Sequence, residues 1–277
     1  VPDRLPLDCR TTAEVLNRGC ACISVDHESL KRALEAGDGT LSHAQLLATR
    51  PHLFADSMVF VSAVHLARMA RVVEVLERLV AMPAYRERVL AHAPALARHS
   101  PLAAGVFLGY DFHLGPDGPQ LIEINSNAGG ALLNACLLRA QRACCASVAQ
   151  MLPVETPVEA ALVAMFREEW RLARRGCVDR PLARIAIVDA LPEQQYLAPE
   201  FELFRRLFEA NGIVAMIADP AELTFDGMCL SCRGLSIDLV YNRLTDFALA
   251  EPQHAALRMA YLADAVVLTP HPQQHAL

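Results

Sequence analysis

The alternation of short apolar runs with amphipathic segments after residue 183 constrains the fold more than any other feature of this chain. Four apolar runs of the length typical of buried strands lie at residues 184–189, 213–217, 236–241 and 265–268. Residues 199–210 and 253–263 have the apolar spacing of amphipathic helices, and residues 223–232 are expected to form a hairpin. Strand–helix–strand repetition predicts a small parallel α/β layer.

The first hundred residues have helical patterns instead. Asp26 and Ser42 are typical N-caps, residues 55–82 form the longest amphipathic segment, and Pro83 ends it or begins a helix at 84–92. Two more helices are expected at 130–150 and 157–175, and no closing element is expected at 272–277. The chain is thus predicted to be an α/β (α+β) protein, with a helical region at 1–180 and an α/β subdomain at 181–277.

Composition and charge exclude several classes of partner. The net charge of -6, from 25 basic and 31 acidic residues, argues against nucleic acid and anionic membranes, because both require clustered positive charge. No apolar run reaches the ~18 residues that a membrane span needs. The nine cysteines show no disulfide framework, so reduced thiols and a cytoplasmic location are expected. Cys229 and Cys232 form a Cys-x-x-Cys pair, but no second pair stands at the spacing of a zinc site.

A second hairpin is predicted within residues 101–130. The apolar runs 105–113 and 120–125 are joined by Gly-Pro-Asp-Gly-Pro, which is a turn-forming segment. A turn centred on Asp117 places Asp111 opposite Glu123 and Gly109 opposite Asn125. Because side chains alternate between the faces of a strand, Asp111, Glu123 and Asn125 are expected to share one face. The Cβ atoms of the two acids would lie about 4.5–5.5 Å apart.

This face has the composition of a magnesium site. Two carboxylates placed opposite each other destabilise a sheet, and a divalent cation removes that cost. Mg²⁺ prefers oxygen ligands, and Asp111, Glu123 and the amide oxygen of Asn125 supply them. Gly129 and Gly130 follow at the start of a helix, where small residues let backbone N–H groups approach an anion. The alternative is an ordinary hairpin edge with solvated acids, or a bulge that shifts the register by one residue.

Polar residues also follow two of the predicted strands of the α/β layer. Arg243 follows the third strand, and ligands of open α/β sheets bind beyond the carboxyl ends of strands. Since a guanidinium binds a carboxylate through two hydrogen bonds, Arg243 is predicted to bind substrate, with a surface salt bridge as the alternative. Gln194, Gln195 and Tyr196 occupy the analogous position after the first strand, and they are substrate-binding candidates unless they form a plain polar loop.

The segment from 107 to 130 resembles a known family. Phe-Leu-Gly stands at 107–109, and Ile-Glu-Ile-Asn-Ser-Asn-Ala-Gly-Gly stands at 122–130. This pattern resembles the magnesium-binding end of ATP-grasp ligases. Because an α/β layer follows the motif, the order is similar to that of the permuted glutathione synthetase of eukaryotes. Val-Tyr-Asn-Arg at 240–243 resembles the family's strand that ends in a substrate-contacting arginine, whereas residues 1–100 match only in being helical.

The resemblance implies a cytoplasmic ATP- and Mg²⁺-dependent carboxylate–amine ligase, which joins a small-molecule acid and amine through an acyl phosphate. It implies a helical layer with a hairpin of the ATP-grasp core, followed by a Rossmann-like substrate-binding subdomain. The residues it assigns to the site are Asp111, Glu123 and Asn125 for the metal, Gly129 and Gly130 for the nucleotide, and Ser126, Asn127 and a catalytic Arg243 for the substrate. Asp111 could instead contact the substrate, and a homodimer is left open because the permuted family tends to dimerise.

The chain also departs from the family's pattern. Gly109 and Tyr110 stand where the family has an arginine, and Asn127 and Ala128 alter its serine-rich loop, so the acid substrate is not identified. Lys31 is the only lysine among the 25 basic residues, although ATP-grasp enzymes hold phosphates with lysines of a lobe that would come next. The chain is therefore expected to be an incomplete part of the enzyme. The alternative is a non-catalytic ATP-grasp-fold binding or scaffold protein.

Overall fold

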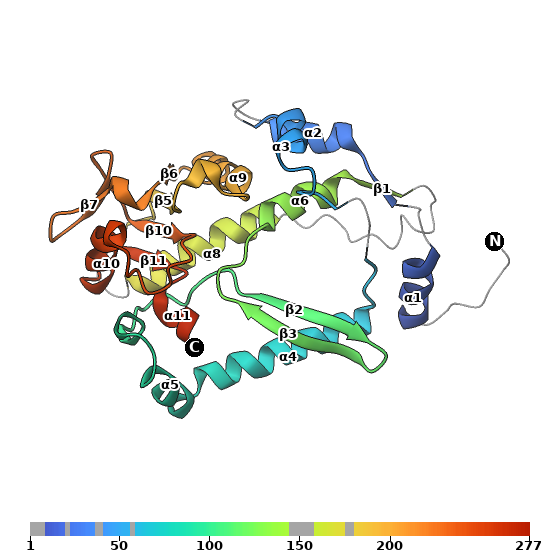
Figure 1. Ribbon diagram of the computed structural model, residues 1–277, viewed down its shortest axis with the longest axis horizontal. Coiled ribbons are helices and arrows are strands. Elements are labelled where there is room, and N and C mark those ends of the chain that lie inside the picture. The colour runs from blue at the N-terminus through green and yellow to red at the C-terminus, as the bar shows by residue number, and fades with distance from the viewer. Residues whose placement is uncertain (1–8, 20–22, 37–40, 56–58, 144–157, 175–179) are drawn as a thin grey trace. The chain divides into compact units, whose positions relative to one another are not determined.

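The computed structural model describes residues 9–19, 23–36, 41–55, 59–143, 158–174 and 180–277 as a mixture of helices and small sheets (Figure 1). Contacts within the chain divide it into two compact units. The first unit holds residues 1–82, 110–125 and 133–156, and the second holds residues 83–109, 126–132 and 157–277. The helix that precedes residue 180 packs on the sheet of the second unit, and the division of the chain after residue 180 stays a prediction.

The N-terminal helices of the first unit are α1 (Cys9–Gly19), α2 (His27–Glu35), α3 (His43–Thr49) and α4 (Ala63–Ala81). The last three begin where the sequence offers side-chain caps. Asp26 accepts hydrogen bonds from the backbone of Glu28 and Ser29 at the start of α2, and Ser42 caps α3 in the same way. Helix α4 begins later than the predicted residue 55, because the hydroxyl of Ser62 accepts the N–H of His65 at 3.2 Å.

Two small sheets complete the first unit. Strands β2 (Gly109–Gly115) and β3 (Gly118–Asn125) pair with each other, and α4 packs against β3 (Figure 1). Strand β1 (Ile23–Val25) pairs antiparallel with β4 (Gln141–Ala143). Helix α6 (Ala131–Ala140) ends where β4 begins, so the helix predicted over 130–150 is too long, and residues 144–157 lie outside the described part of the chain.

The second unit is built on a four-stranded parallel sheet, as the alternating pattern predicts. Its strands are ordered β11-β10-β5-β6. They span Arg184–Val188 (β5), Val214–Ala218 (β6), Leu239–Asn242 (β10) and Val267–Thr269 (β11). Leu239 of β10 is in register with Ile185 of β5 and with Val267 of β11. The first strand of the sheet along the chain, β5, thus lies in its interior, with β6 on one side and β10 and β11 on the other.

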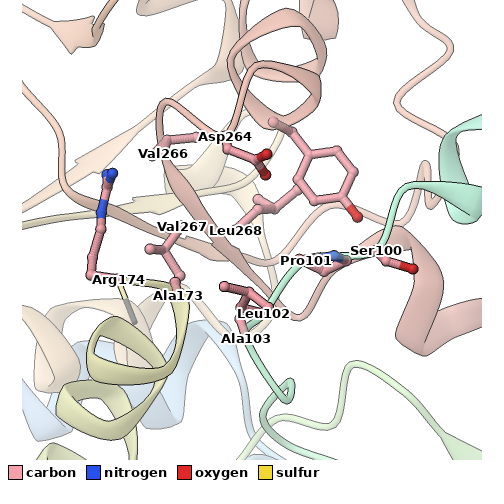
Figure 2. Close-up of a pocket in the computed structure, with 11 residues that line it drawn as sticks. Ser100, Pro101, Leu102, Ala103, Ala173, Arg174, Asp264, Val266, Val267 and Leu268 are labelled. Carbon is pink, nitrogen blue, oxygen red and sulfur yellow. The ribbon is translucent and has the colours of Figure 1, made fainter. Parts of the chain in front are cut away.

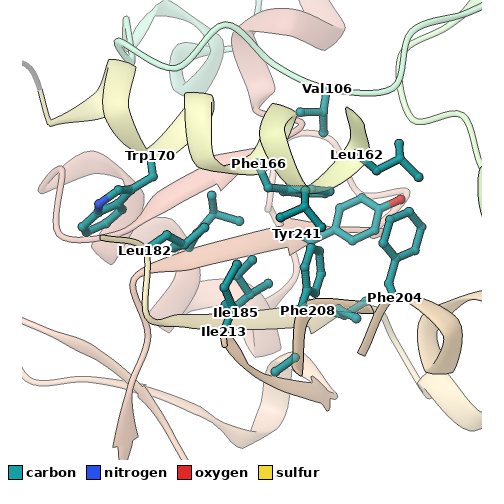
Figure 3. Close-up of a cluster of buried hydrophobic side chains, with 14 of the residues drawn as sticks. Val106, Leu162, Phe166, Trp170, Leu182, Ile185, Phe204, Phe208, Ile213 and Tyr241 are labelled. Atoms are coloured by element: carbon teal, nitrogen blue, oxygen red, sulfur yellow. The ribbon is translucent and has the colours of Figure 1, made fainter. Parts of the chain in front are cut away.

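Helices cover both faces of this sheet. Helices α8 (Val158–Ala173) and α9 (Ala198–Ala210) pack on one face through a cluster of aromatic rings (Figure 3). The ring centroid of Phe166 lies 5.0 Å from those of Phe208 and Tyr241, in edge-to-face geometry. Alternate strand residues, among them Ala186 and Val240, face the other side and pack with α10 (Ala255–Leu262). Burial on both faces explains why the strands are continuous apolar runs.

The remaining elements of the second unit lie outside the sheet. Strands β7 (Leu223–Phe225), β8 (Leu230–Cys232) and β9 (Leu235–Ser236) form an antiparallel sheet, which confirms the hairpin predicted at 223–232. Helix α5 (Pro83–Leu90) begins at the proline that ends α4. The expectation of no closing element was wrong, because α11 (Pro272–Ala276) starts with a proline and is capped by His271. In the described part of the chain, no helix is both long and apolar enough to span a bilayer.

Candidate functional site

The hairpin of β2 and β3 is fixed on α4 by polar contacts. Its turn lies at Pro116 and Asp117, and Gly118 follows with a φ of 108°, a conformation that favours glycine. Arg68 of α4 donates to the carbonyl of Asp117 at 3.4 Å. The hydroxyl of Tyr110 donates to Glu77 at 2.9 Å, and burial together with this carboxylate raises the pKa of Tyr110 to about 12. The hairpin therefore has a defined position within its unit.

The structure brings the three predicted metal ligands together on this hairpin. The side-chain nitrogen of Asn125 donates to Oδ2 of Asp111 at 3.3 Å and to Oε1 of Glu123 at 3.1 Å. All three residues are exposed to solvent. One amide can bridge the two carboxylates only when the three side chains lie on the same side of the hairpin, which is the arrangement expected from the turn.

The chemistry of this set fits a hard divalent cation. The amide N–H₂ of Asn125 donates into the space between the two carboxylates, and it partly offsets their repulsion. Rotation of this amide by half a turn would present its oxygen instead, and the set would then be two carboxylates and one carbonyl. In the described residues, no cluster of three or more His, Cys, Asp or Glu side chains could hold a metal. A site on this hairpin would consequently depend on the amide and on water or substrate oxygens.

A separate polar cluster lies at the carboxyl edge of the parallel sheet, in the second unit. Arg243 follows β10 and is 8% exposed. Its Nη1 donates to Oδ1 of Asn127 at 2.5 Å and to the carbonyl of Ala128 at 3.0 Å, and its guanidinium lies 5.5 Å from the ring centroid of Tyr241. These acceptors are neutral oxygens, so the hydrogen bonds orient the guanidinium without neutralising its charge. Asn127 and Arg243, both predicted for substrate, are thus in direct contact.

Gly129 lies against the same guanidinium. A Cβ atom at this position would come within 2.5 Å of Leu197 and 2.8 Å of Nη2 of Arg243, so a larger residue here would displace the ends of these two side chains. The next N–H groups are already used, because Glu200 accepts from the backbone of Gly130 at 2.6 Å and of Leu132 at 3.0 Å. The N–H of Gly130 therefore points at a side chain of this chain, not at open space where a nucleotide could bind. Their role stays a prediction from the resemblance.

Glu200 is a residue that the sequence did not indicate. It lies in the first turn of α9, where an acid normally faces solvent, yet it is 1% exposed. Its carboxylate occupies the N-terminus of α6, the position where the sequence predicts an anion. The N–H groups at the start of α6 therefore bind a carboxylate, and that carboxylate belongs to Glu200 of the same chain.

Ser126 also acquires a partner from far along the sequence. Its hydroxyl lies 2.6 Å from Nδ1 of His275, and the His275 ring stacks on Phe247 with 4.0 Å between the ring centroids. Burial lowers the pKa of His275 to about 4, so this ring is neutral at physiological pH. No local signal in the sequence connects these residues.

The loop after β5 carries three of the residues predicted to bind substrate. Gln194 ends a short 3-10 helix, the amide of Gln195 donates to the carbonyl of Ala190 at 2.6 Å, and Tyr196 is 52% exposed. None of the contacts found among the described residues joins these three side chains to Arg243 or Asn127. The structure therefore places them at the predicted edge of the sheet without bringing them into the cluster, and their substrate role stays a prediction.

Asp189 ends the same strand and carries an unusual carboxyl group. Burial raises its pKa to about 6, and the backbone N–H of Ala190 and the charge of Arg243 oppose this shift. A raised pKa means that the folded state binds the proton more tightly than the unfolded chain does. Ionisation of Asp189 thus costs stability as the pH rises from its ordinary value of 3.8 to about 6.

Replacing Asp189 with asparagine is expected to remove this pH dependence. The Asp189→Asn variant should gain stability relative to the natural protein between about pH 4 and pH 6, and the difference should then stay constant. Urea unfolding at a series of pH values measures it. Asp226→Asn is the matched control, because backbone N–H groups of Cys229 and Met228 lower the pKa of Asp226 and its effect has the opposite sign. A difference for Asp189→Asn that does not change with pH would contradict the expectation.

Comparisons with known proteins leave the family open: no family model matches the chain, and no curated protein sequence is significantly similar to it. The metal alternatives are also weak. Cys229 and Cys232 are free thiols, and the helix of α11 uses His271 as its N-cap. The hairpin of Asp111 and Glu123 and the cluster around Arg243 are therefore the candidate sites of the two units.

Proposed function

We propose that this chain is part of an ATP- and Mg²⁺-dependent carboxylate–amine ligase of the permuted, glutathione synthetase-like ATP-grasp type. In such a reaction ATP phosphorylates a substrate carboxylate, and the amine displaces phosphate from the acyl phosphate to form an amide. The observation that carries the proposal is the hairpin, on which one amide joins two carboxylates on a face open to solvent. The layout would combine this hairpin of the ATP-grasp core with the parallel sheet as the substrate-binding subdomain.

Magnesium would be held by Asp111, Glu123 and Asn125. When bound there, the ion would neutralise charge on the phosphate oxygens during transfer. The chain's own part is to hold the two carboxylates close together at a fixed position. The turn at Pro116 and Asp117 and the contact of Tyr110 with Glu77 support that role, because they orient the strands that carry the ligands.

Arg243 would bind a carboxylate of the acid substrate. Its guanidinium is buried, oriented by Asn127 and Ala128, and stacked on Tyr241. A buried and oriented cation at the carboxyl edge of a parallel sheet is well suited to a small anionic ligand. Asn127 would hold the guanidinium in place through its hydrogen bond. Ser126, the preceding residue, would contact the substrate.

The test is a screen of acids and amines with the full-length protein, with phosphate release from ATP as the readout. Phosphate release that requires Mg²⁺, one acid and one amine together is the expected result. Binding of Mg-ATP without release in any combination would instead support the non-catalytic binding or scaffold protein. If the protein neither binds Mg-ATP nor releases phosphate, the ATP-grasp proposal is removed altogether.

Replacing Arg243 with alanine is expected to weaken binding of the acid by roughly 10- to 100-fold, since a charge-assisted hydrogen bond contributes about 1.5–3 kcal/mol. The KM for ATP should change by less than about threefold, because the arginine would contact only the acid. Steady-state kinetics with each substrate varied in turn measures both. Equal losses for acid and ATP would assign Arg243 a structural role, and circular dichroism of the variant shows whether it folds.

A further inference from the structure

A small pocket opens at the amino edge of the parallel sheet, away from Arg243. It lies at the start of β11, with Val267 and Leu268 in its wall, and has a volume of about 240 Å³ (Figure 2). Leu102 and Ala103 complete its apolar part. Because β10 and β11 are parallel, the start of β11 and the residue after β10 are at opposite edges of the sheet. The pocket is therefore distinct from the candidate substrate cluster.

Arg174 supplies an unpaired cation to this pocket. Its guanidinium lies 4.8 Å from the ring centroid of Trp170, and among the described residues its side chain has no hydrogen-bond or ion-pair partner. Its Nε is buried, and buried polar atoms normally have partners. Arg180 offers a comparison, because it also lies 4.8 Å from the Trp170 ring but is paired with Asp238 at 2.8 Å. Of these two arginines, Arg174 is the one whose guanidinium has no acidic partner among the described residues and could bind an anion.

Asp264 supplies the opposite charge. It follows α10 with a φ of 50°, and its side chain is 74% exposed. One carboxylate oxygen, Oδ1, lies 2.9 Å from Nε2 of His99, whereas Oδ2 has no partner among the described residues. Figure 2 shows Arg174 and Asp264 toward one side of the pocket and the side chains of Leu102 and Ala103 toward the other. The pocket thus combines two opposite charges with an apolar floor.

We propose that this pocket binds a free apolar α-amino acid. Its carboxylate would accept hydrogen bonds from Arg174, its ammonium group would donate to Oδ2 of Asp264, and its side chain would lie on the apolar floor. A simple organic anion would be repelled by Asp264, and a simple cation by Arg174, so a zwitterion is the chemistry that both charges favour. The small volume limits the ligand to the size of leucine or a similar residue.

L-leucine is the probe, and Trp170 reports its binding. Trp170 is the only tryptophan of the chain, and Arg174 lies over its ring, so engagement of the guanidinium changes the fluorescence. Titration of the full chain with L-leucine is expected to give a saturable change, with isothermal titration calorimetry as a second measurement. Arg174→Gln and Asp264→Asn should each weaken binding by about tenfold or more, because each removes one charge-assisted contact. Asparagine tolerates the positive φ at position 264.

The controls separate recognition of the two charges from non-specific effects. Arg171→Gln changes an exposed arginine of the same helix, paired with Glu168, and should bind L-leucine like the natural protein. Leucinamide lacks the carboxylate and N-acetyl-leucine lacks the ammonium group, so both should bind at least tenfold more weakly. The proposal is overturned if L-leucine gives no saturable signal by either method. It is also overturned if the analogues bind as well as L-leucine, or if Arg174→Gln binds it unchanged.

Discussion

The Glu169→Ala variant is expected to be less stable than the natural protein by about 3–5 kcal/mol, because the substitution leaves buried donors without an acceptor. Glu169 lies on α8 and is 3% exposed. Its two oxygens accept the backbone N–H of Ala104 at 3.0 Å and of Gly105 at 2.9 Å, and the hydroxyl of Thr269 at 2.7 Å. One side chain therefore joins α8, the segment before the hairpin, and the end of β11.

Urea unfolding followed by Trp170 fluorescence measures this loss, since Trp170 lies next to Glu169 and reports on the second unit. Glu168→Ala is the matched control. Glu168 is exposed, and its ion pair with Arg171 lies on the surface, so its removal should cost less than about 1 kcal/mol. A loss below about 1 kcal/mol for Glu169→Ala would mean that water replaces the carboxylate at the three donors.

The parts of the fold that the sequence predicts are those whose signal is local. The strands β5, β6, β10 and β11 are apolar runs bounded by polar residues, and burial on both faces is what makes such runs continuous. The start of α2 is likewise marked by Asp26, whose side chain caps the next residues. The hairpin site is local too, because its turn alone determines that Asp111, Glu123 and Asn125 lie together.

The parts that the sequence does not predict depend on contacts between distant residues. Glu169 and Glu200 occupy positions in amphipathic helices where an acid usually faces water, and only the arrival of Ala104, Gly105 or Gly130 makes them buried acceptors. The ladder of β1 and β4 joins three residues to three others more than a hundred positions away, so neither segment carries a pattern of its own. Ser126 and His275 are brought together in the same way.

Replacing Glu123 with glutamine is expected to reduce Mg-ATP-dependent phosphate release by at least about 100-fold, if the proposed ligase function holds. The substitution removes one negative charge and keeps the size and the carbonyl oxygen of the side chain. A metal ion that bridges phosphates supplies several kcal/mol of transition-state stabilisation, and the loss of a charged ligand weakens it. Phosphate release by the full-length protein, measured over a range of Mg²⁺ concentrations, tests this expectation.

The same variant should fold normally. Glu123 is exposed, and a glutamine oxygen can still accept the hydrogen bond that Asn125 donates at 3.1 Å. The change also removes repulsion between Glu123 and Asp111, so stability should be unchanged or higher by a few tenths of a kcal/mol. Asp117→Asn, which changes an exposed acid in the turn of the same hairpin, is the matched control and should keep its activity.

Stability and activity together decide what Glu123 does. Two adjacent acids on an exposed hairpin weaken the sheet that carries them, so a fold selected for stability alone has no physical reason to keep both. If Glu123→Gln is as stable as the natural protein and inactive, the carboxylate serves the metal and the cost of its repulsion is explained. Unchanged phosphate release would remove Glu123 from the site, and a parallel loss of stability and activity would make it a structural residue of the hairpin.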